Sequence, residues 1–218
     1  MTEYGLLLGP DGLARCPWAL SAPEYIDYHD TEWGRPLHGD DQLFERLTLE
    51  GFQSGLSWLT ILRKRENFRN AFDGFAIEAV ANYGQPDVDR LLADAGIVRN
   101  RAKIGAAITN ARAARDLPDG LDALLWSFAP GPVPAEAARP AATTLAEIPA
   151  QTAESKAMAK ALKRNGFVFV GPTTCYALMQ AVGMVDDHLA GCHAAGNASE
   201  HGSASEHGSA GEHGSASG

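Results

Sequence analysis

The stretch LLADAGIVRNRAK, residues 91–103, decides the fold. Apolar residues recur at helical spacing up to Gly96, and a second helical pattern runs from about residue 100 to residue 115. A glycine directly after an apolar helical run is typical of a helix C-terminus. The segment therefore predicts two helices joined by a tight hairpin.

Two interpretations of this hairpin stay open. Backbone N–H groups at such a turn, next to the N-terminus of the following helix, can hold a phosphate of DNA. An ordinary helix–helix turn with a glycine cap has the same pattern. If a phosphate binds here, the residues that contact it are the glycine and the bases that follow: Gly96, Arg99, Arg101 and Lys103.

Helical patterns also cover most of the chain on either side of the hairpin. Residues 21–24 (Ser-Ala-Pro-Glu) have the form of a capping box, and Asp40 or Asp41 would cap the next helix. The one strand-like run, residues 167–170, has no second run to pair with. The sequence therefore predicts a mainly α protein.

Composition limits the class of protein. The chain has 218 residues, of which 45% are hydrophobic and 21% charged, as in one globular domain. No run approaches the ~20 consecutive apolar residues of a membrane span, and residues 1–15 lack the pattern of a secretion signal. Three cysteines, an odd number, disfavour a disulfide framework. We expect no membrane contact and a cytoplasmic location.

The net charge of −9 counts against nucleic-acid binding, because phosphate neutralisation dominates such affinity. The charges are segregated, however. Residues 24–50 hold eight acids and two arginines, whereas residues 63–69, 99–115 and 156–164 hold thirteen bases and one acid. This distribution permits a positive face on an acidic protein, although solvated helix surface is the alternative.

The last residues form a separate segment. From about residue 196 a six-residue Ser/Glu/His/Gly/Ala unit repeats, with no large apolar residue after Leu189. Such a segment buries too little apolar surface to offset its ordering entropy, so we expect a flexible tail. We divide the chain into an N-terminal extension (1–14), a domain (15–195) and this tail (196–218).

Two cysteines and two histidines form a candidate metal site. Two Cys and two His complete a tetrahedral zinc set with no open position, so the role would be structural. From spacing alone, two unrelated pairs are the alternative. The four residues are Cys16 and His29 near the start of the chain, and His188 and Cys192 near its end.

An aromatic group surrounds one carboxylate. Glu50 stands in the middle of an apolar helical pattern, where a carboxylate is either exposed or held for a purpose. Aromatic rings can stack a base that has swung out of a duplex, although core packing is their commoner use. The five rings are Trp18, Tyr25, Tyr28, Trp33 and Trp58.

Together these segments resemble the 3-methyladenine DNA glycosylase I family. They stand in the family's order and cover roughly residues 15–193. The segments are RCPW (15–18), YIDYHDTEWG (25–34), LEGFQSGLSW (49–58), KRENF (64–68), DAGIVR (94–99), LWSF (125–128), GFVFVG (166–171), DH (187–188) and GC (191–192).

The resemblance implies a helix-hairpin-helix DNA glycosylase fold, with two helical lobes and a base pocket between them. It implies one structural zinc on Cys16, His29, His188 and Cys192, which joins the two ends of the chain. The implied enzyme is a monomer and monofunctional. It flips out and hydrolytically excises N3-methyladenine, and also N3-methylguanine, from alkylated double-stranded DNA, releasing free 3-methyladenine.

The resemblance also implies residue roles. Glu50 would bind the exocyclic amine of the flipped base, Trp58 would stack on it, and Tyr28 would offer a hydroxyl. Trp18 and Tyr25 would wall the pocket. Leu56 would fill the gap left in the duplex.

Two departures from the wider superfamily bear on these roles. Val98 stands where the hairpin usually has a second glycine. The superfamily's catalytic aspartate is carried over to none of Asp116, Asp119 and Asp122, because this family does without it.

A non-catalytic, zinc-containing helix-hairpin-helix DNA-binding protein is the main alternative. A pure phosphate binder has no use for a carboxylate among aromatic rings, so Glu50 favours the enzyme. An acidic interaction module that uses residues 196–218 has only the repeat in its favour.

Overall fold

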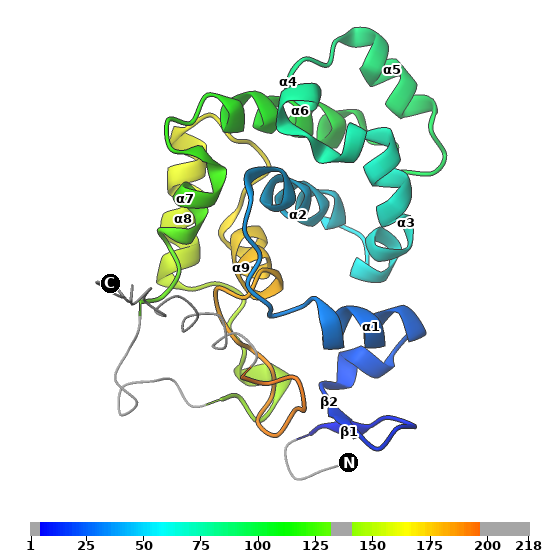
Figure 1. Ribbon diagram of the computed structural model, residues 1–218, viewed down its shortest axis with the longest axis vertical. Helices are drawn as coiled ribbons and strands as arrows, with labels where there is room; N and C mark the ends of the chain where they lie inside the picture. Colours follow the sequence, from blue (N-terminus) through cyan, green and yellow to red (C-terminus); the bar gives the residue numbers. More distant parts are fainter. Residues whose placement is uncertain (1–4, 132–140, 197–218) are drawn as a thin grey trace, which may run out of the picture.

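A computed structural model describes residues 5–131 and 141–196 (Figure 1). Helices dominate these ranges, which confirms the mainly α class. None of the described helices is long and apolar enough to cross a bilayer. The α-helices are α1 (Pro23–Thr31), α2 (Asp40–Gln53), α3 (Trp58–Ala71), α4 (Ile77–Ala81), α5 (Gln85–Ala93), α6 (Arg101–Arg115), α7 (Gly120–Trp126), α8 (Ala153–Arg164) and α9 (Pro172–Ala181). Short 3₁₀ turns are η1 (Pro17–Leu20), η2 (Asp73–Phe75) and η4 (Leu145–Glu147).

Helix α2 lies at the centre of the main core, with α3, α6 and α9 around it (Figure 1). Rings from α2, α3 and η2 fill the space between these helices, and the Phe72 and Phe75 rings stack with centroids 5.4 Å apart. Each buried aromatic ring removes a large apolar area from water, so these rings hold the helical layers together. The fully buried phenylalanine rings are Phe44, Phe52, Phe68, Phe72 and Phe75, together with Phe167.

The acids at the start of α2 cap other helices, which corrects one expectation. The N-cap of α2 is Gly39, with no side-chain cap. Asp41 Oδ1 instead accepts the Ile77 N–H of α4 at 2.8 Å, and Asp40 Oδ1 accepts the Asp122 N–H of α7 at 2.8 Å. Two orphan donors of neighbouring helices are thereby satisfied by α2.

The capping box expected at residues 21–24 is also absent. The N-cap of α1 is Ala22, and no side chain caps the helix. The Ser21 hydroxyl donates instead to the Trp18 carbonyl of η1 at 2.6 Å. The preceding 3₁₀ turn therefore takes up the hydroxyl that would have capped α1.

The expected hairpin joins α5 to α6, but its glycine has another purpose than a helix cap. Helix α5 ends at Ala93, and Gly96 does not adopt a left-handed backbone. A Cβ on Gly96 would meet Asn67 Cβ at 3.1 Å and Asp94 Oδ1 at 2.9 Å. Glycine is therefore needed for the close approach of α3. Asn100 caps α6 by accepting the Lys103 N–H at 3.1 Å.

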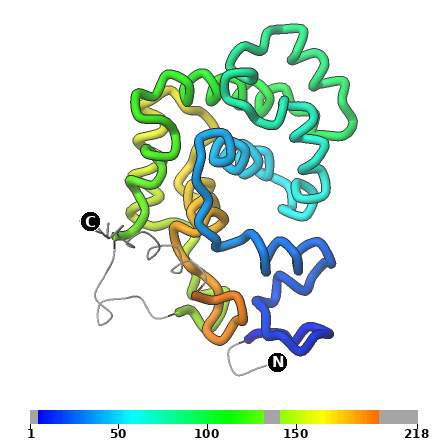
Figure 2. Tube along the Cα trace, in the orientation of Figure 1, coloured from blue at the N-terminus to red at the C-terminus, as the bar shows by residue number. Residues whose placement is uncertain are grey.

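The two ends of the described chain meet in a second, smaller core, as the blue and orange segments of Figure 2 show. An antiparallel hairpin, β1 (Leu7–Leu8) and β2 (Ala14–Arg15), packs there, so the boundary drawn between residues 14 and 15 cuts through a strand. The buried members of this core are Leu6, Cys16, Ala142, Leu189, Cys192 and Ala194. The tail beyond Gly196 lies outside the described residues.

Candidate active site

A cavity of about 380 Å³ opens between α1, α2, α3, α9 and η4. All five aromatic residues singled out in the sequence line it, together with Glu50. Their grouping was the reason to expect a site, and the fold brings them together from four elements. The described lining is Trp18, Tyr25, Tyr28, Trp33, Glu50, Gln53, Trp58, Leu145, Ile148, Ala177 and Gln180.

The rings brace one another. The Trp18 ring stands edge-on to Tyr25, with centroids 5.6 Å apart, and to Trp33 at 5.2 Å. The Tyr28 and Trp58 rings lie 5.6 Å apart. Edge-to-face pairs at these distances add to the stability gained from burial alone. The walls are therefore preorganised for a flat apolar ligand.

Glu50 is the one carboxylate among the described lining residues, and it is only 7% exposed. No described residue donates a hydrogen bond to it. Burial raises the pKa of Glu50 to about 8, and the charge of Arg46 offsets this only in part. The Trp58 Nε1–H is likewise buried with no acceptor among residues 5–131 and 141–196. Buried polar groups without partners indicate a ligand that supplies them.

Arg46 donates its hydrogen bond to Glu32 and not to Glu50. Its guanidinium donates to Glu32 at 2.5 Å, and Arg65 donates to both oxygens of Glu32 at 2.6 and 2.7 Å. Burial raises the pKa of Glu32, but these hydrogen bonds outweigh burial and lower it to about 2. Arg46 therefore gives its described hydrogen bond to Glu32, and only its charge acts on Glu50.

Several lining residues were missed in the sequence. Gln180 on α9 donates through Nε2 to Asp187 at 2.8 Å, and Asp187 also accepts the Tyr176 hydroxyl at 2.5 Å. Leu145 and Ile148 arrive from η4. These positions lie more than ninety residues after Glu50, and no local pattern marks them. Only the tertiary fold brings them to the cavity.

Leu56 is 41% exposed and lies between the lining residues Gln53 and Trp58 in sequence. Its N–H donates to the Gln53 carbonyl at 2.6 Å, and the preceding Gly55 has a φ of +80°. A left-handed backbone at Gly55 suits glycine and turns the chain so that an apolar side chain faces solvent.

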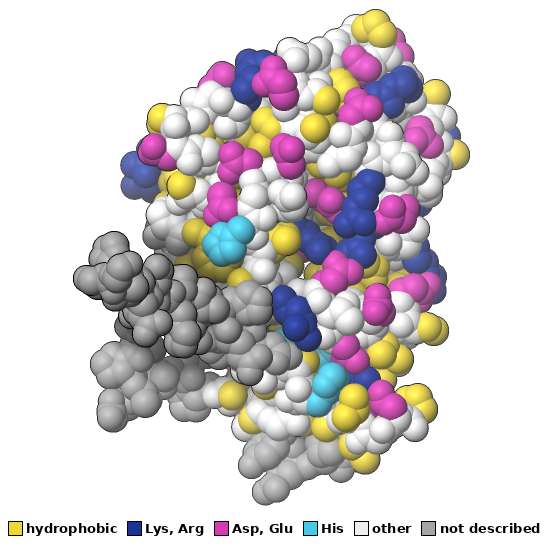
Figure 3. Space-filling view, viewed as in Figure 1, with side chains coloured by type: hydrophobic (Ala, Val, Ile, Leu, Met, Phe, Trp, Pro, Cys, Tyr) yellow, Lys and Arg dark blue, Asp and Glu magenta, His cyan; other side chains and the backbone are white. Residues whose placement is uncertain are grey.

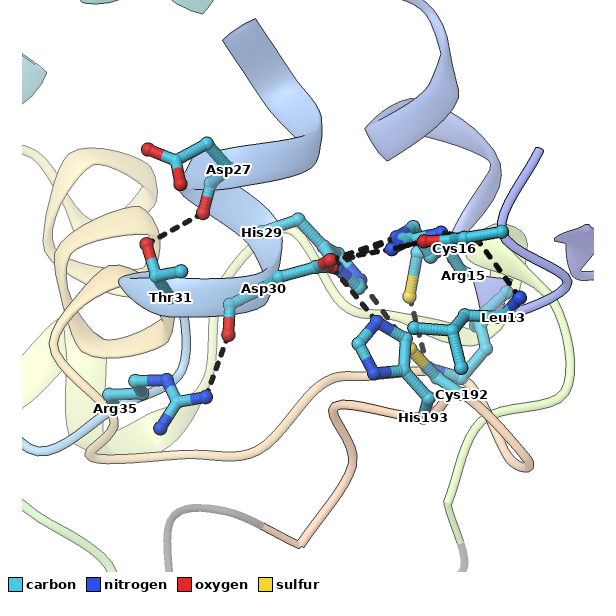
Figure 4. Close-up of polar contacts among 12 residues, drawn as sticks. Leu13, Arg15, Cys16, Asp27, His29, Asp30, Thr31, Arg35, Cys192 and His193 are labelled. Atoms are coloured by element: carbon cyan, nitrogen blue, oxygen red, sulfur yellow. Dashed lines mark hydrogen bonds and ion pairs between the residues drawn. The ribbon is translucent and has the colours of Figure 1, made fainter. Parts of the chain in front are cut away.

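Three of the four predicted metal ligands converge (Figure 4). The ligand atoms of Cys16, His29 and Cys192 all lie within 4.8 Å of one another, and all three residues are buried. Cys192 Sγ is 3.4 Å from His29 Nε2. A hydrogen bond from Cys16 and the proximity of His29 lower the pKa of Cys192. The Leu189 N–H donates to Cys16 Sγ at 3.4 Å.

The fourth predicted ligand, His188, lies outside that tight group but beside it. Its ring centroid is 5.0 Å from that of His29. Both histidines use Nδ1 for a carboxylate at 2.7 Å, His29 with Asp30 and His188 with Asp186. His188 Nε2 is buried and has no partner among the described residues. A histidine that binds a carboxylate through Nδ1 and keeps Nε2 for another partner is typical of a metal ligand, so the donor set fits zinc.

The neighbouring His193 has a different partner. Its Nε2 lies 2.9 Å from Asp30 Oδ1, the carboxylate that also binds His29 and Arg15 (Figure 4). His29, Asp30 and His193 form a second possible group of ligand atoms. His193 is partly exposed, whereas Cys192 is buried beside Cys16.

The Cys/His group supports the pocket wall. The Trp33 ring lies 4.7 Å from His188, and the Trp18 ring lies 5.1 Å from His29. His29 also follows the lining residue Tyr28 directly on α1. Anything that fixes these histidines therefore also fixes the aromatic walls.

Most bases expected to face phosphates are used within the fold. Arg99 is exposed and has no described acceptor, whereas Arg101 lies 3.7 Å from Asp89. Lys103 Nζ donates to the carbonyls of Phe52 and Ser54 at 2.8 and 2.6 Å, which ties α6 to the end of α2.

The bases of residues 63–69 are also paired within the fold. Figure 3 shows basic and acidic side chains interspersed on the face it draws. The contacts are Arg63 with Glu24, Lys64 with the carbonyls of Ala95 and Gly96, Arg65 with Glu32, and Arg69 with Glu45.

A family model described as methyladenine glycosylase matches residues 18–195. DNA-3-methyladenine glycosylase 1 of Escherichia coli (strain K12) is 48% identical over 183 residues, which are 83% of this chain and 96% of that protein. DNA-3-methyladenine glycosylase of Haemophilus influenzae is 44% identical over 182 residues, which are 82% of this chain and 96% of that protein.

Solved structures share the fold. A crystal structure of 3-methyladenine DNA glycosylase I superposes with a TM-score of 0.75 at 45% identity, covering 82% of this chain and 98% of that chain. A variant of 3-methyladenine DNA glycosylase I in complex with 3-methyladenine gives a TM-score of 0.76 at 32% identity, covering 83% of this chain and 97% of that chain.

Proposed function

The chain belongs to the methyladenine glycosylase family, and on that premise we propose that it excises N3-methyladenine from alkylated double-stranded DNA. N3-methylguanine is a second substrate in this proposal. The observation that carries it is Glu50, a buried carboxylate without a hydrogen-bond donor in a cavity walled by aromatic rings.

The cavity selects the base by charge and shape. Methylation at N3 gives the purine a positive charge, and a charged acceptor attracts it strongly where water is excluded. Glu50 in its ionised form accepts from the exocyclic amine, Trp58 stacks on the ring and Tyr28 offers its hydroxyl. Trp18 and Tyr25 close the walls. A neutral purine lacks the charge that compensates the buried carboxylate.

Little chemistry is then left for the protein. The electron pair of the glycosidic bond moves to the departing base and neutralises it, and water adds to the sugar carbon to leave an abasic site. The described lining contains no lysine, so no Schiff base forms there and the enzyme is monofunctional. Binding that holds the cationic base and stabilises its departure supplies the catalysis.

DNA contacts come from the hairpin and from the loop before α3. The Gly96 N–H is occupied by Asp94 Oδ1 at 2.7 Å, so the N–H groups of the next turn residues meet the phosphate, with Arg99 and Arg101 beside them. Lys103 contributes its remaining donor. Leu56 fills the space that the flipped nucleotide leaves.

One zinc per chain completes the proposal, held by Cys16, His29, His188 and Cys192. A closed tetrahedral set supplies structural stability rather than Lewis-acid chemistry. These residues join the segment before η1 and the last turn of α1 to the last described segment, behind Trp18 and Trp33. In this proposal the protein acts as a cytoplasmic monomer.

The test is to incubate the protein with methylated duplex DNA and identify the free bases by chromatography. We expect 3-methyladenine from the methylated duplex and no base from an unmodified one. Binding to DNA without release of any base would instead support the non-catalytic DNA-binding alternative.

A further inference from the structure

Four bases on α8 stand apart from the other described bases. They are exposed and meet no carboxylate or carbonyl within the described ranges. Elsewhere in those ranges, every lysine and arginine except Arg99 contacts a carboxylate or a backbone carbonyl. Within residues 5–131 and 141–196, the free positive charge is therefore concentrated on one helix face, although the chain has a net charge of −9. The four bases are Lys156, Lys160, Lys163 and Arg164.

These side chains line a common hollow. Together with Ala159 and Pro172, the first residue of α9, they border a groove of about 400 Å³. Residues 156–164 span about 12 Å of helix, along which a DNA duplex carries roughly seven charges. The groove therefore offers four cations at a spacing that suits a phosphate backbone.

The segment between α8 and α9 connects this face to the hairpin. Asn110 of α6, which is 5% exposed, donates to the Val168 carbonyl at 3.1 Å and accepts the Val168 N–H at 2.8 Å. The next residue, Phe169, is 51% exposed and has a φ of +57°, which is strained for a residue with a side chain. The segment is thus held against α6 with an apolar ring facing solvent.

Phe169 also lies beside the end of α2, from which the chain runs on to Leu56. It shares a small hollow with Lys103 and Phe52, and Lys103 holds the Ser54 carbonyl two residues before Leu56. Phe169 in turn stands three residues before Pro172, which borders the groove. Clamped backbone and exposed apolar rings at such a position are typical of a binding surface.

We propose that this α8 face is a second phosphate-binding surface for the duplex held by the hairpin, so that the protein grips DNA on both sides of Phe169. The inference rests on the proposed function. Charge complementarity favours DNA, because a strongly acidic protein needs concentrated cations to approach a polyanion. The paired bases of residues 63–69 offer no substitute.

The test compares two double variants with the same loss of charge. Lys160→Gln with Lys163→Gln removes two groove cations. Arg90→Gln with Arg115→Gln removes two bases that pair with Asp87 and Asp116. Each protein is titrated with an undamaged duplex between 50 and 200 mM salt, and thermal melts check that both variants are folded.

We expect the groove variant to lower the slope of log affinity against log salt by about 1.8, at about 0.9 per lost contact. The ratio of wild-type affinity to variant affinity should then be about 12-fold smaller at 200 mM salt than at 50 mM salt. The control should keep the wild-type slope. A folded groove variant with an unchanged slope overturns the second surface. Release of 3-methyladenine by the wild type, measured separately, tests the proposed function, so either idea can fail alone.

Discussion

Glu32 and Glu50 lie on either side of Arg46 in the fold, and they meet opposite environments. Glu32 accepts hydrogen bonds from Arg46 and Arg65, which lower its pKa to about 2 although burial opposes them. Glu50 is buried without a donor, and its pKa rises to about 8. Two residues of one type therefore differ both in their partners and in how deeply they are buried.

This difference separates a region that stabilises the fold from one prepared for a ligand. The Glu32 cluster pairs its carboxylate with two arginines and joins α2 to α3, although Arg46 Nη1 has no partner among the described residues. The Glu50 cavity leaves a carboxylate and the Trp58 N–H without described partners. Pairs of acids whose environments drive their pKa values apart mark functional sites.

The largest expected effect comes from breaking the support behind the Glu50 cavity. Cys192→Ala should abolish zinc binding and cost at least about 3 kcal/mol, a fall in Tm of roughly 10 °C, with the Glu32 cluster left intact. Metal analysis and thermal melts measure both. Cys175→Ala, which removes a buried thiol far from the group, should keep one zinc, as should truncation after Gly196. Loss of zinc on truncation would contradict the site.

The second-largest effect should come from replacing Glu32, the acid that is hydrogen-bonded to two arginines. Glu32→Gln leaves Arg46 and Arg65 without their acceptor and should cost about 2 kcal/mol at pH 7. Because the folded pKa lies below the unfolded one, the stabilisation is complete above about pH 4.5 and is lost as the pH falls toward 2. In denaturant melts from pH 3 to 7, the free energy of unfolding of the variant should therefore fall less steeply at low pH than that of the wild type. The same pH dependence in the variant and the wild type would refute the pairing of Glu32 with Arg46 and Arg65.

Glu50→Gln should change stability in the opposite direction. Its folded pKa lies above the unfolded value, so ionisation of Glu50 destabilises the folded state as the pH rises from about 4.5 toward 8. The variant should melt roughly 5 °C above the wild type at pH 8 and close to it at pH 4.5. Glu78→Gln, a substitution at an exposed position, should leave the melting temperatures at pH 8 and pH 4.5 unchanged. A less stable Glu50→Gln protein at pH 8 would mean that the carboxylate has a partner.

The smallest effect tests the hairpin. Arg99→Ala should lower the salt slope of binding by about 0.9 and weaken binding equally on damaged and undamaged duplexes. Arg63→Ala removes a base already paired with Glu24 and should leave the slope unchanged. If the two variants behave alike in a salt titration, the distinction between paired and free bases fails.

The sequence predicts the aromatic group and Glu50 because they lie in three short segments near one end of the chain. The helical class followed from periodicity. The exact caps did not follow, since Asp40 and Asp41 cap helices that only the fold brings near. The pairing of Arg46 with Glu32 rather than Glu50 has no local signature either. Donors that are distant in the sequence decide which acid is hydrogen-bonded, and the composition of the chain does not identify those donors.

Single-turnover release of 3-methyladenine as a function of pH tests the role of Glu50 most directly. Because the ionised form binds the cationic base, wild-type kcat/KM should rise with pH and level off above about 8. Glu50→Gln should release base roughly 10- to 150-fold more slowly, the loss of a charge-assisted bond of about 1.5–3 kcal/mol, with a flat profile. Wild-type rates in a folded Glu50→Gln protein, or an identical pH profile in the two proteins, would contradict the account.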